Sequence, residues 1–388
     1  MLNYSAVVSE TVRDMKPSGI RKFFDIVTEM DDVISLGVGE PDFMTPWHIR
    51  SAGIYSLEKG RTWYTSNDGM AELRQGISDY LNRRFGLKYS PKDEVIVTVG
   101  GSEAIDIAVR SLVSPGDEVI IPEPSFVCYD PITRMAGGTP VIINTKAEDA
   151  FRLTAEDLKA AITPRTKLLI MPFPNNPTGA VMSREDLEQI AEVLEGTDIM
   201  VLSDEIYAEL TYEGSHVSIA SIGDMRERTI YVGGFSKAYA MTGWRLGYAC
   251  GPSEVMKCLH KVHQYCIMCA PTTSQYAAVE ALKNGDDDIA RMRSEYDMRR
   301  HFIVSGLKAA GMPCFDPKGA FYVFPSIKAS GMNSEEFCQK LLYDKKVAVV
   351  PGTAFGDCGE GFVRISYSYS VKHLTEALRR IGDFMSHC

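Results

Sequence analysis

The sequence lacks any segment that would direct the chain into or across a membrane. Its first nine residues contain no basic region followed by an apolar core, and a secretory signal peptide needs both. No apolar run approaches the roughly 18–20 residues of a membrane-spanning helix. We therefore expect a soluble protein with no membrane partner.

Positive charge is also scarce. The 388 residues include 41 Lys and Arg against 51 Asp and Glu, which gives a formal net charge of −10. Nucleic acids and anionic lipid surfaces repel such a chain, so neither is expected as a partner. An anionic substrate would need positive charge concentrated at its own site.

A disulfide framework is missing as well. The nine cysteines are an odd number without regular spacing, which favours the reducing cytoplasm. Cys266 and Cys269 form one C-x-x-C pair, and their apolar neighbours favour buried packing thiols in a helix over redox or zinc chemistry. His260 and His263 have no carboxylate or cysteine motif beside them, so we expect no metal site.

The middle of the chain contains short apolar runs rich in β-branched residues, separated by helical patterns. The runs lie at residues 94–99, 118–121, 140–143, 167–171, 199–202, 229–232 and 246–250. They are apolar on both faces, as buried parallel strands are. In the helical pattern at 183–194, Ser183 and Asp186 come close to a capping box. The alternation predicts a doubly wound α/β domain.

The order of elements changes near residue 285. Helical patterns are expected at 289–311, 334–344 and 371–385, and strand-like pieces at 320–324, 347–350 and 362–367. We therefore expect three parts. Residues 1–45 form an N-terminal arm and part of a small domain, residues 46–284 a large α/β domain, and residues 285–388 the rest of the small α+β domain.

Two loops that follow predicted strands are suited to binding a ligand. Gly101 and Ser102 lie in a Gly-Gly-Ser turn that opens a helix, where free N–H groups favour a phosphate. The turn matches neither the dinucleotide nor the nucleoside-triphosphate fingerprint. Asn176 lies in a Pro-Asn-Asn-Pro-Thr-Gly loop at the carboxyl end of a strand, where open α/β sheets bind ligands. Glycine packing and a plain Asx turn are the alternative interpretations.

Three charged residues stand at positions where burial is costly. Asp204 ends an apolar strand and needs a cation or donor, unless it only caps a helix. Lys237 follows a Gly-Gly turn among apolar residues, and desolvation there would lower its pKa and make its amine a nucleophile, unless it is a solvated surface lysine. Arg364 lies inside an alternating strand, where its planar fork suits a carboxylate or a structural salt bridge.

Together these motifs resemble the class I/II aminotransferases, a fold-type-I family of pyridoxal-phosphate enzymes. The resemblance covers essentially the whole chain. It rests on Ser-Lys-x5-Gly-Trp-Arg at 236–245, Asn-Pro-Thr-Gly at 176–179 and Asp-x-x-Tyr at 204–207. It implies a large domain with a mostly parallel seven-stranded sheet and a smaller α+β domain. The implied activity moves the amino group of an L-α-amino acid to an α-keto acid by a ping-pong mechanism.

The resemblance also implies roles around the cofactor ring. Lys237 carries pyridoxal phosphate as a Schiff base and later moves the substrate's α-proton. Asp204 pairs with the pyridine nitrogen and keeps it protonated, which makes the ring an electron sink. Asn176 and Tyr207 bond the phenolic oxygen, and Phe126 stacks on the ring.

For the phosphate, the resemblance implies contacts from Ser236 and Arg245, together with the backbone at Gly101 and Ser102. Family members often have a serine where this chain has Gly234, so one phosphate hydroxyl is missing.

For the substrate, Arg364 clamps the α-carboxylate, with Gly39 and Asn176 beside it. Tyr64 matches a tyrosine that reaches the phosphate of the neighbouring subunit, which implies a homodimer.

Other activities on this fold remain open at this point. The closest resemblance is to enzymes acting on aspartate, aromatic and diaminopimelate-type amino acids. A pyridoxal-phosphate C–S β-lyase is the main alternative, although such relatives tend to have histidine where Tyr207 stands. A non-enzymatic pyridoxal-phosphate sensor is the remaining alternative, and the acidic chain disfavours it.

Overall fold

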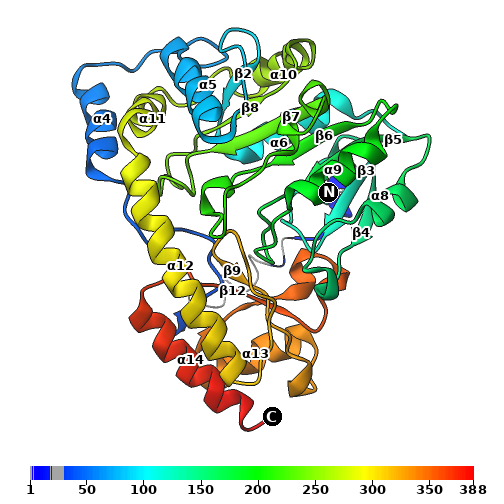
Figure 1. Ribbon diagram of the computed structural model, residues 1–388, viewed down its shortest axis with the longest axis vertical. Helices are drawn as coiled ribbons and strands as arrows, with labels where there is room; N and C mark the ends of the chain where they lie inside the picture. The colour runs from blue at the N-terminus through cyan, green and yellow to red at the C-terminus, as the bar shows by residue number, and fades with distance from the viewer. Residues whose placement is uncertain (1, 3, 18, 20–29) are drawn as a thin grey trace.

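A seven-stranded sheet dominates the computed structural model, which describes residue 2, residues 4–17, residue 19 and residues 30–388 (Figure 1). The strand order is β2 (Val95–Thr98), β8 (Gly247–Cys250), β7 (Thr229–Gly234), β6 (Met200–Asp204), β5 (Thr166–Met171), β3 (Glu118–Glu123) and β4 (Thr139–Asn144). β8 runs antiparallel to both neighbours, and the remaining pairs are parallel. The predicted mostly parallel sheet is confirmed.

Helices cover both faces of this sheet. They are α4 (Trp47–Glu58), α5 (Ala71–Phe85), α6 (Gly100–Leu112), α7 (Tyr129–Met135), α8 (Ala155–Ala161), α9 (Arg184–Leu194), α10 (Ser253–Cys266) and α11 (Thr272–Asn284). In β3, Val119 and Ile121 pack toward α6 and α7, while Ile120 packs toward α8 and α9. Each central strand therefore needs apolar residues at successive positions, which explains the continuous apolar runs of the sequence.

The start of α9 shows why one helix was readable from sequence. Ser183 Oγ accepts a hydrogen bond from the Asp186 backbone N–H, and Asp186 Oδ2 accepts one from the Ser183 N–H at 2.9 Å. This is the capping box that the sequence predicts, and it satisfies N–H groups that the helix cannot pair internally.

A second group of elements packs below the sheet in Figure 1. It consists of α12 (Asp286–Ala309), α13 (Ser334–Lys345), α14 (Val371–Met385), β1 (Ile34–Ser35), β9 (Tyr322–Val323), β10 (Val347–Ala348), β11 (Val350–Pro351) and β12 (Val363–Ser366). β1 pairs with β10, and β12 lies between β9 and β11. Two short helices, α1 (Tyr4–Val7) and α2 (Glu10–Arg13), precede this group in the chain.

The helix expected at about 289–311 is confirmed. It begins at Asp286, because the carboxylates of three aspartates in its first turn interact favourably with the positive end of the helix dipole. Two other expectations about local structure are wrong. The strand expected at 347–350 is two short strands that pair with different partners. Cys266 and Cys269 are not buried helical thiols: Cys266 ends α10 exposed, and Cys269 lies beyond it, partly exposed.

Among the described residues, no helix has the length and apolar character that a bilayer span requires.

Candidate active site

A cavity of about 520 Å³ lies where β6, β7 and the start of α6 approach β9 and β12. The predicted site residues that line it are Gly39, Gly101, Ser102, Phe126, Asn176, Asp204, Tyr207, Ser236, Lys237, Arg245 and Arg364. They come from segments far apart in the sequence. The carboxyl ends of the parallel strands and the loops beside them bring most of these residues together, whereas Gly39 follows β1 and Arg364 lies in β12.

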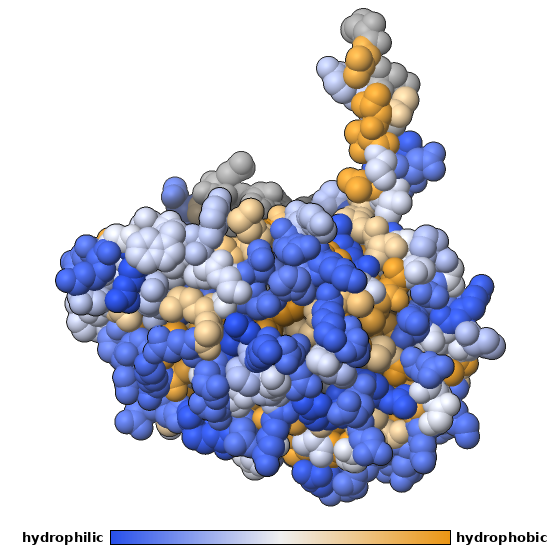
Figure 2. All heavy atoms as spheres, turned by 90° about the horizontal axis from the view of Figure 1, so that it is seen from above, coloured by the Kyte–Doolittle hydropathy of each residue, from blue (hydrophilic) through white to orange (hydrophobic). Residues whose placement is uncertain are grey.

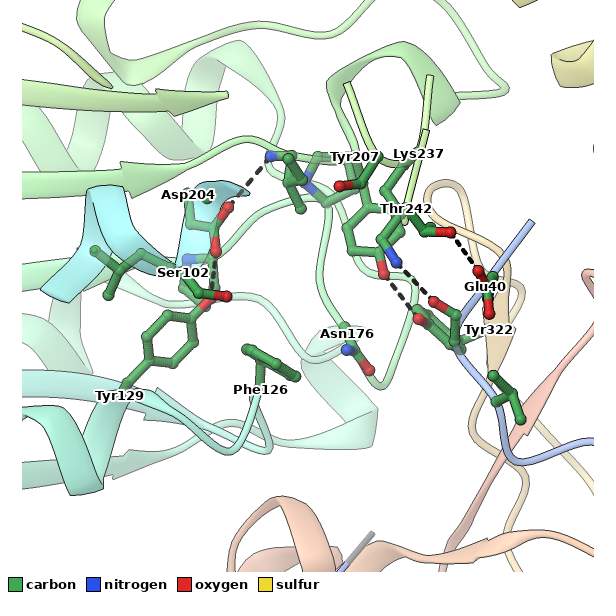
Figure 3. Close-up of a pocket in the computed structure, with 18 of the residues that line it drawn as sticks. Glu40, Ser102, Phe126, Tyr129, Asn176, Asp204, Tyr207, Lys237, Thr242 and Tyr322 are labelled. Atoms are coloured by element: carbon green, nitrogen blue, oxygen red, sulfur yellow. Dashed lines mark hydrogen bonds between the residues drawn. The ribbon is translucent and has the colours of Figure 1, made fainter. Parts of the chain in front are cut away.

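Lys237 extends into the cavity from the segment that follows β7 (Figure 3). Its Nζ donates to the carbonyl oxygen of Gly39 at 2.6 Å and lies 5.6 Å from the ring centres of Tyr207 and Phe321. Burial, together with the positive charge of Arg364, lowers the pKa of Lys237 from 10.5 to about 8. The amine is therefore available as a nucleophile and base near neutral pH.

Asp204 occupies the last position of β6, with 8% of its surface exposed. Its Oδ2 accepts from the Tyr129 hydroxyl at 2.7 Å, and its Oδ1 accepts from the Ile206 N–H at 3.2 Å. Burial raises the pKa of Asp204, and the hydrogen bond from Tyr129 opposes this rise. Two neutral donors only partly compensate a buried carboxylate, so this group is suited to receive a cationic N–H.

The start of α6 and Arg245 form a site for an anion. Gly100 has φ of +73°, and a Cβ added there would lie 2.7 Å from Arg245 Nη2. The guanidinium therefore lies against the bare backbone that leads to Gly101 and Ser102. The first N–H groups of a helix have no internal partner, and together with this guanidinium they suit a phosphate.

Arg364 occupies β12 with 2% of its surface exposed. Its Nη1 donates to Asn176 Oδ1 at 2.9 Å, and its Nη2 donates to the carbonyl oxygen of Gly37. Within the described part of the chain, its Nε has no hydrogen-bond partner. A buried guanidinium that lines the cavity with one N–H free is suited to a carboxylate.

The Pro-Asn-Asn-Pro-Thr-Gly loop divides its two asparagines. Asn175 Oδ1 accepts from the backbone N–H of Thr178 at 3.1 Å and from its hydroxyl at 2.8 Å. Asn175 thus makes the Asx-type turn, which leaves Asn176 to face the cavity and Arg364. The Asx turn is thus made by Asn175, while Asn176 lines the cavity, where ligand binding stays a prediction.

Sequence reasoning missed several residues that line this cavity. Tyr129 holds Asp204, and the Tyr322 hydroxyl lies 2.7 Å from the Tyr207 hydroxyl (Figure 3). Thr242 donates to the carboxylate of Glu40. No local pattern marks these pairs, because the partners lie far apart in the sequence and meet only in the folded chain.

A steric contact explains why glycine stands at position 234, where the resemblance leads us to expect serine. A Cβ added there would lie 2.7 Å from Ile206 Cδ1 and 3.2 Å from Gly247 Cα. A serine would require Ile206 to move its Cδ1 and β8 to shift at Gly247, so the close contact between β7, β8 and residue 206 disfavours a side chain here.

Tyr64 lies apart from the cavity, with 75% of its side chain exposed. It follows α4 on the loop that leads to α5, beside Trp63, which is also exposed.

Comparison with known proteins gives one consistent result. The profile of the family described as "Aminotransferase class I and II" matches residues 31–381. The putative aminotransferase YugH of Bacillus subtilis is 53% identical, over 98% of this chain and 99% of its own. The probable N-acetyl-LL-diaminopimelate aminotransferase of the same organism is 44% identical, over 98% and 96%. The solved aspartate aminotransferase of Thermus thermophilus with maleate superposes with a TM-score of 0.93 at 39% identity, over 97% and 99%.

Proposed function

Because the chain belongs to the class I and II aminotransferase family, and is thus a pyridoxal-phosphate-dependent enzyme that transaminates amino acids, we propose that Lys237 is the residue that holds the cofactor covalently. The observation that carries this assignment is the Lys237 amine in the cavity, with its pKa lowered to about 8 by burial. A neutral amine is the form that bonds an aldehyde.

The described residues fit the cofactor. When bound, pyridoxal phosphate withdraws electrons from the substrate's α-carbon and so acidifies the α-proton. Asp204 is a buried carboxylate with two neutral donors, and it would hold the ring nitrogen in its protonated form. Asn176 and Tyr207 would donate to the phenolic oxygen, and Phe126 would stack against the ring.

The phosphate would lie at the start of α6. Arg245 already packs against Gly100, and Ser236 lines the same cavity. The N–H groups of Gly101 and Ser102 would complete the set of donors. The geometry concentrates positive charge at this point, which an acidic chain needs to bind an anion.

Arg364 would hold the substrate's α-carboxylate with its free Nε and its Nη groups, next to Gly39 and Asn176. The substrate's α-proton would then be transferred by Lys237 Nζ.

We propose amino-group donors in the aspartate, aromatic and diaminopimelate-type range. Among the described residues, Lys237, Arg245 and Arg364 are the cations that line the cavity, so a second substrate carboxylate would need a donor beyond these three.

We further propose a homodimer in which Tyr64 binds the partner's phosphate. Large exposed hydrophobic residues lie around α4, the loop after it and the end of α10: Trp47, Ile54, Tyr55, Leu57, Trp63, Tyr64, Tyr265, Ile267 and Met268. A hydrogen bond from Asn67 Nδ2 to the Met268 carbonyl joins the last two regions. Exposed apolar surface of this extent is typical of an interface.

The N-terminal arm supports the same proposal. Leu2, Tyr4, Val7 and Val12 are exposed apolar residues on or beside α1 and α2, and Figure 2 shows an apolar arm standing away from the body. We also propose that the chain divides into an N-terminal arm with part of the small domain (residues 1–45), a large domain (46–284) and the rest of the small domain (285–388). We propose a cytoplasmic location, with which the nine free cysteines agree.

Replacement of Lys237 tests this function. Lys237→Ala should abolish amino-group transfer to an α-keto acid and should remove the covalently held cofactor that borohydride fixes to the wild-type chain. Lys257→Ala removes an exposed lysine paired with Glu254 and should behave as wild type. Full transfer by the Lys237→Ala variant would refute the assignment.

A further inference from the structure

His263 and Glu103 form a buried pair directly behind the start of α6. The side chain of His263, on α10, is fully buried, and that of Glu103, on α6, is 9% exposed. His263 Nδ1 lies 2.6 Å from Glu103 Oε1, and His263 Nε2 lies 2.8 Å from the carbonyl oxygen of Asn67. The absence of a carboxylate near His263 in the sequence was misleading, because Glu103 comes from a distant helix.

The contacts determine how many protons the pair holds. The Asn67 carbonyl only accepts, so Nε2 carries a hydrogen. Glu103 Oε2 already accepts from the Val99 N–H, and an ionised carboxylate only accepts, so the hydrogen bond to Nδ1 needs a second proton. This second proton resides on His263 or on Glu103. In either case the pair holds one proton more than a neutral histidine beside an ionised carboxylate.

The pair connects two segments that the proposed function uses. Glu103 binds the N–H of Val99, which opens the phosphate-binding turn, residues 99–102. Asn67 belongs to the Tyr64 loop, residues 64–68, which carries the tyrosine assigned to the partner's phosphate. His260 strengthens the second connection, because its Nδ1 bonds Asp68 Oδ1 one helical turn before His263.

We propose that His263 is a positioning residue: through the proton it shares with Glu103, it fixes the phosphate-binding turn to the Tyr64 loop and so sets the affinity for pyridoxal phosphate. This inference rests on the proposed function. His263 would touch neither cofactor nor substrate. It would act on the subunit's own phosphate through Glu103 and Val99, and on the partner's phosphate through the Tyr64 loop.

The pair has a defined dependence on pH. Burial lowers the pKa of His263, but the hydrogen bond and charge of Glu103 and the charge of Asp68 raise it above its ordinary value of 6.5. The titratable groups around the ring are Glu103 from α6, Asp68 from the Tyr64 loop and His260 from α10. Because this pKa is raised, the proton is held to a higher pH than on an ordinary histidine and is lost as pH rises through the pKa of His263. Its loss leaves the Glu103 carboxylate facing an unprotonated nitrogen.

Two substitutions separate the shared proton from the hydrogen bonds. In His263→Gln, a single amide cannot donate at both ring positions, so one buried acceptor loses its donor and the dissociation constant of pyridoxal phosphate should rise about tenfold at neutral pH. In Glu103→Gln, the amide oxygen can accept from Val99 and the amide nitrogen can donate to a neutral His263. Every hydrogen bond then survives without the extra proton.

The experiment measures the dissociation constant of pyridoxal phosphate from pH 6 to 10 for the full-length enzyme and these variants. The control is His48→Gln, because His48 also bonds at both ring nitrogens, to Glu280 at 2.8 Å and Asp288 at 3.0 Å, but lies outside the cavity. Wild type and control should lose affinity as pH rises through the pKa of His263, and Glu103→Gln should lose less over the same range. The effects of Lys237 ionisation are common to all four proteins.

Wild-type affinity and pH dependence in His263→Gln would overturn the inference. The inference would also be overturned if Glu103→Gln lost as much affinity for pyridoxal phosphate with rising pH as the wild type does. This second variant provides the test if His263→Gln does not fold. If the wild-type enzyme binds no pyridoxal phosphate at any pH, the proposed function fails, which is a different result.

Discussion

Lys237 shows how the cavity changes the chemistry of one residue. A lysine in water is protonated at neutral pH, with a pKa of 10.5, whereas burial here lowers the pKa to about 8. Arg364 and Arg245 add positive charge nearby and act in the same direction. The cavity therefore contains an amine that loses its proton at a lower pH than a lysine in water.

This pKa predicts how the cofactor-free enzyme takes up pyridoxal phosphate. Only the neutral amine reacts, so the uptake rate should rise with pH through about 8 and then level, instead of rising on toward 10.5. Stopped-flow absorbance measures this rate. Arg364→Gln removes a nearby positive charge, which raises the Lys237 pKa and should move the curve to higher pH. A curve that the substitution leaves unmoved would contradict the electrostatic account.

At this scale the sequence predicts side chains better than their partners. Lys237, Asp204 and Arg364 stand out because a charge among apolar residues is costly and needs a reason. Tyr129 and Tyr322 carry no such signal, since an aromatic residue in an apolar stretch is ordinary core. Their roles depend on contacts across 75 and 115 residues of sequence.

The start of α6 carries the main chemistry at the scale of elements. Gly100 has a positive φ and lies against Arg245, so the turn depends on glycine for both backbone conformation and space. Gly86, which ends α5, has a similar φ of +71° but no atom within 4 Å of an added Cβ. Substitutions at these two glycines therefore distinguish the effect of backbone strain from the effect of displacing Arg245.

Replacing each glycine by alanine should give different results. Gly86→Ala should lower the free energy of unfolding by about 1 kcal/mol and leave cofactor affinity unchanged. Gly100→Ala carries the same strain and also displaces Arg245, so pyridoxal phosphate should bind at least about tenfold more weakly. Urea unfolding and a cofactor titration measure the two effects. Equal cofactor affinity in both variants would show that the contact with Arg245 does not matter.

The sheet is the element that the sequence predicts best. Its strands are apolar on both faces because helices cover both faces, and few other structures need such runs. The small strands were harder to place. β9, β10 and β11 have two residues each, and their pairing depends on distant segments such as β1. A two-residue strand contains too little periodicity to be recognised.

At the scale of the whole molecule, four exposed aromatic residues lie on the surface that carries Tyr64, away from its own cavity: Trp47, Tyr55, Trp63 and Tyr265. In the proposed homodimer, each site combines Lys237 of one chain with Tyr64 of the other. Tyr64→Ala and Lys237→Ala should each be impaired as pure dimers. A hybrid of the two has one site with Lys237 and Tyr64 both intact, so mixing the variants after dissociation should restore part of the activity. Activity that stays at the average of the two pure variants would place Tyr64 in its own subunit's site.

The most direct test of the central claim is the visible spectrum of the purified enzyme during a half-reaction with one amino acid at a time. The account predicts a yellow protein whose cofactor band is lost on addition of a donor and returns when an α-keto acid is added, which also names the donor. Release of ammonia and pyruvate, with no recovery on adding any keto acid, would contradict transamination and indicate a lyase.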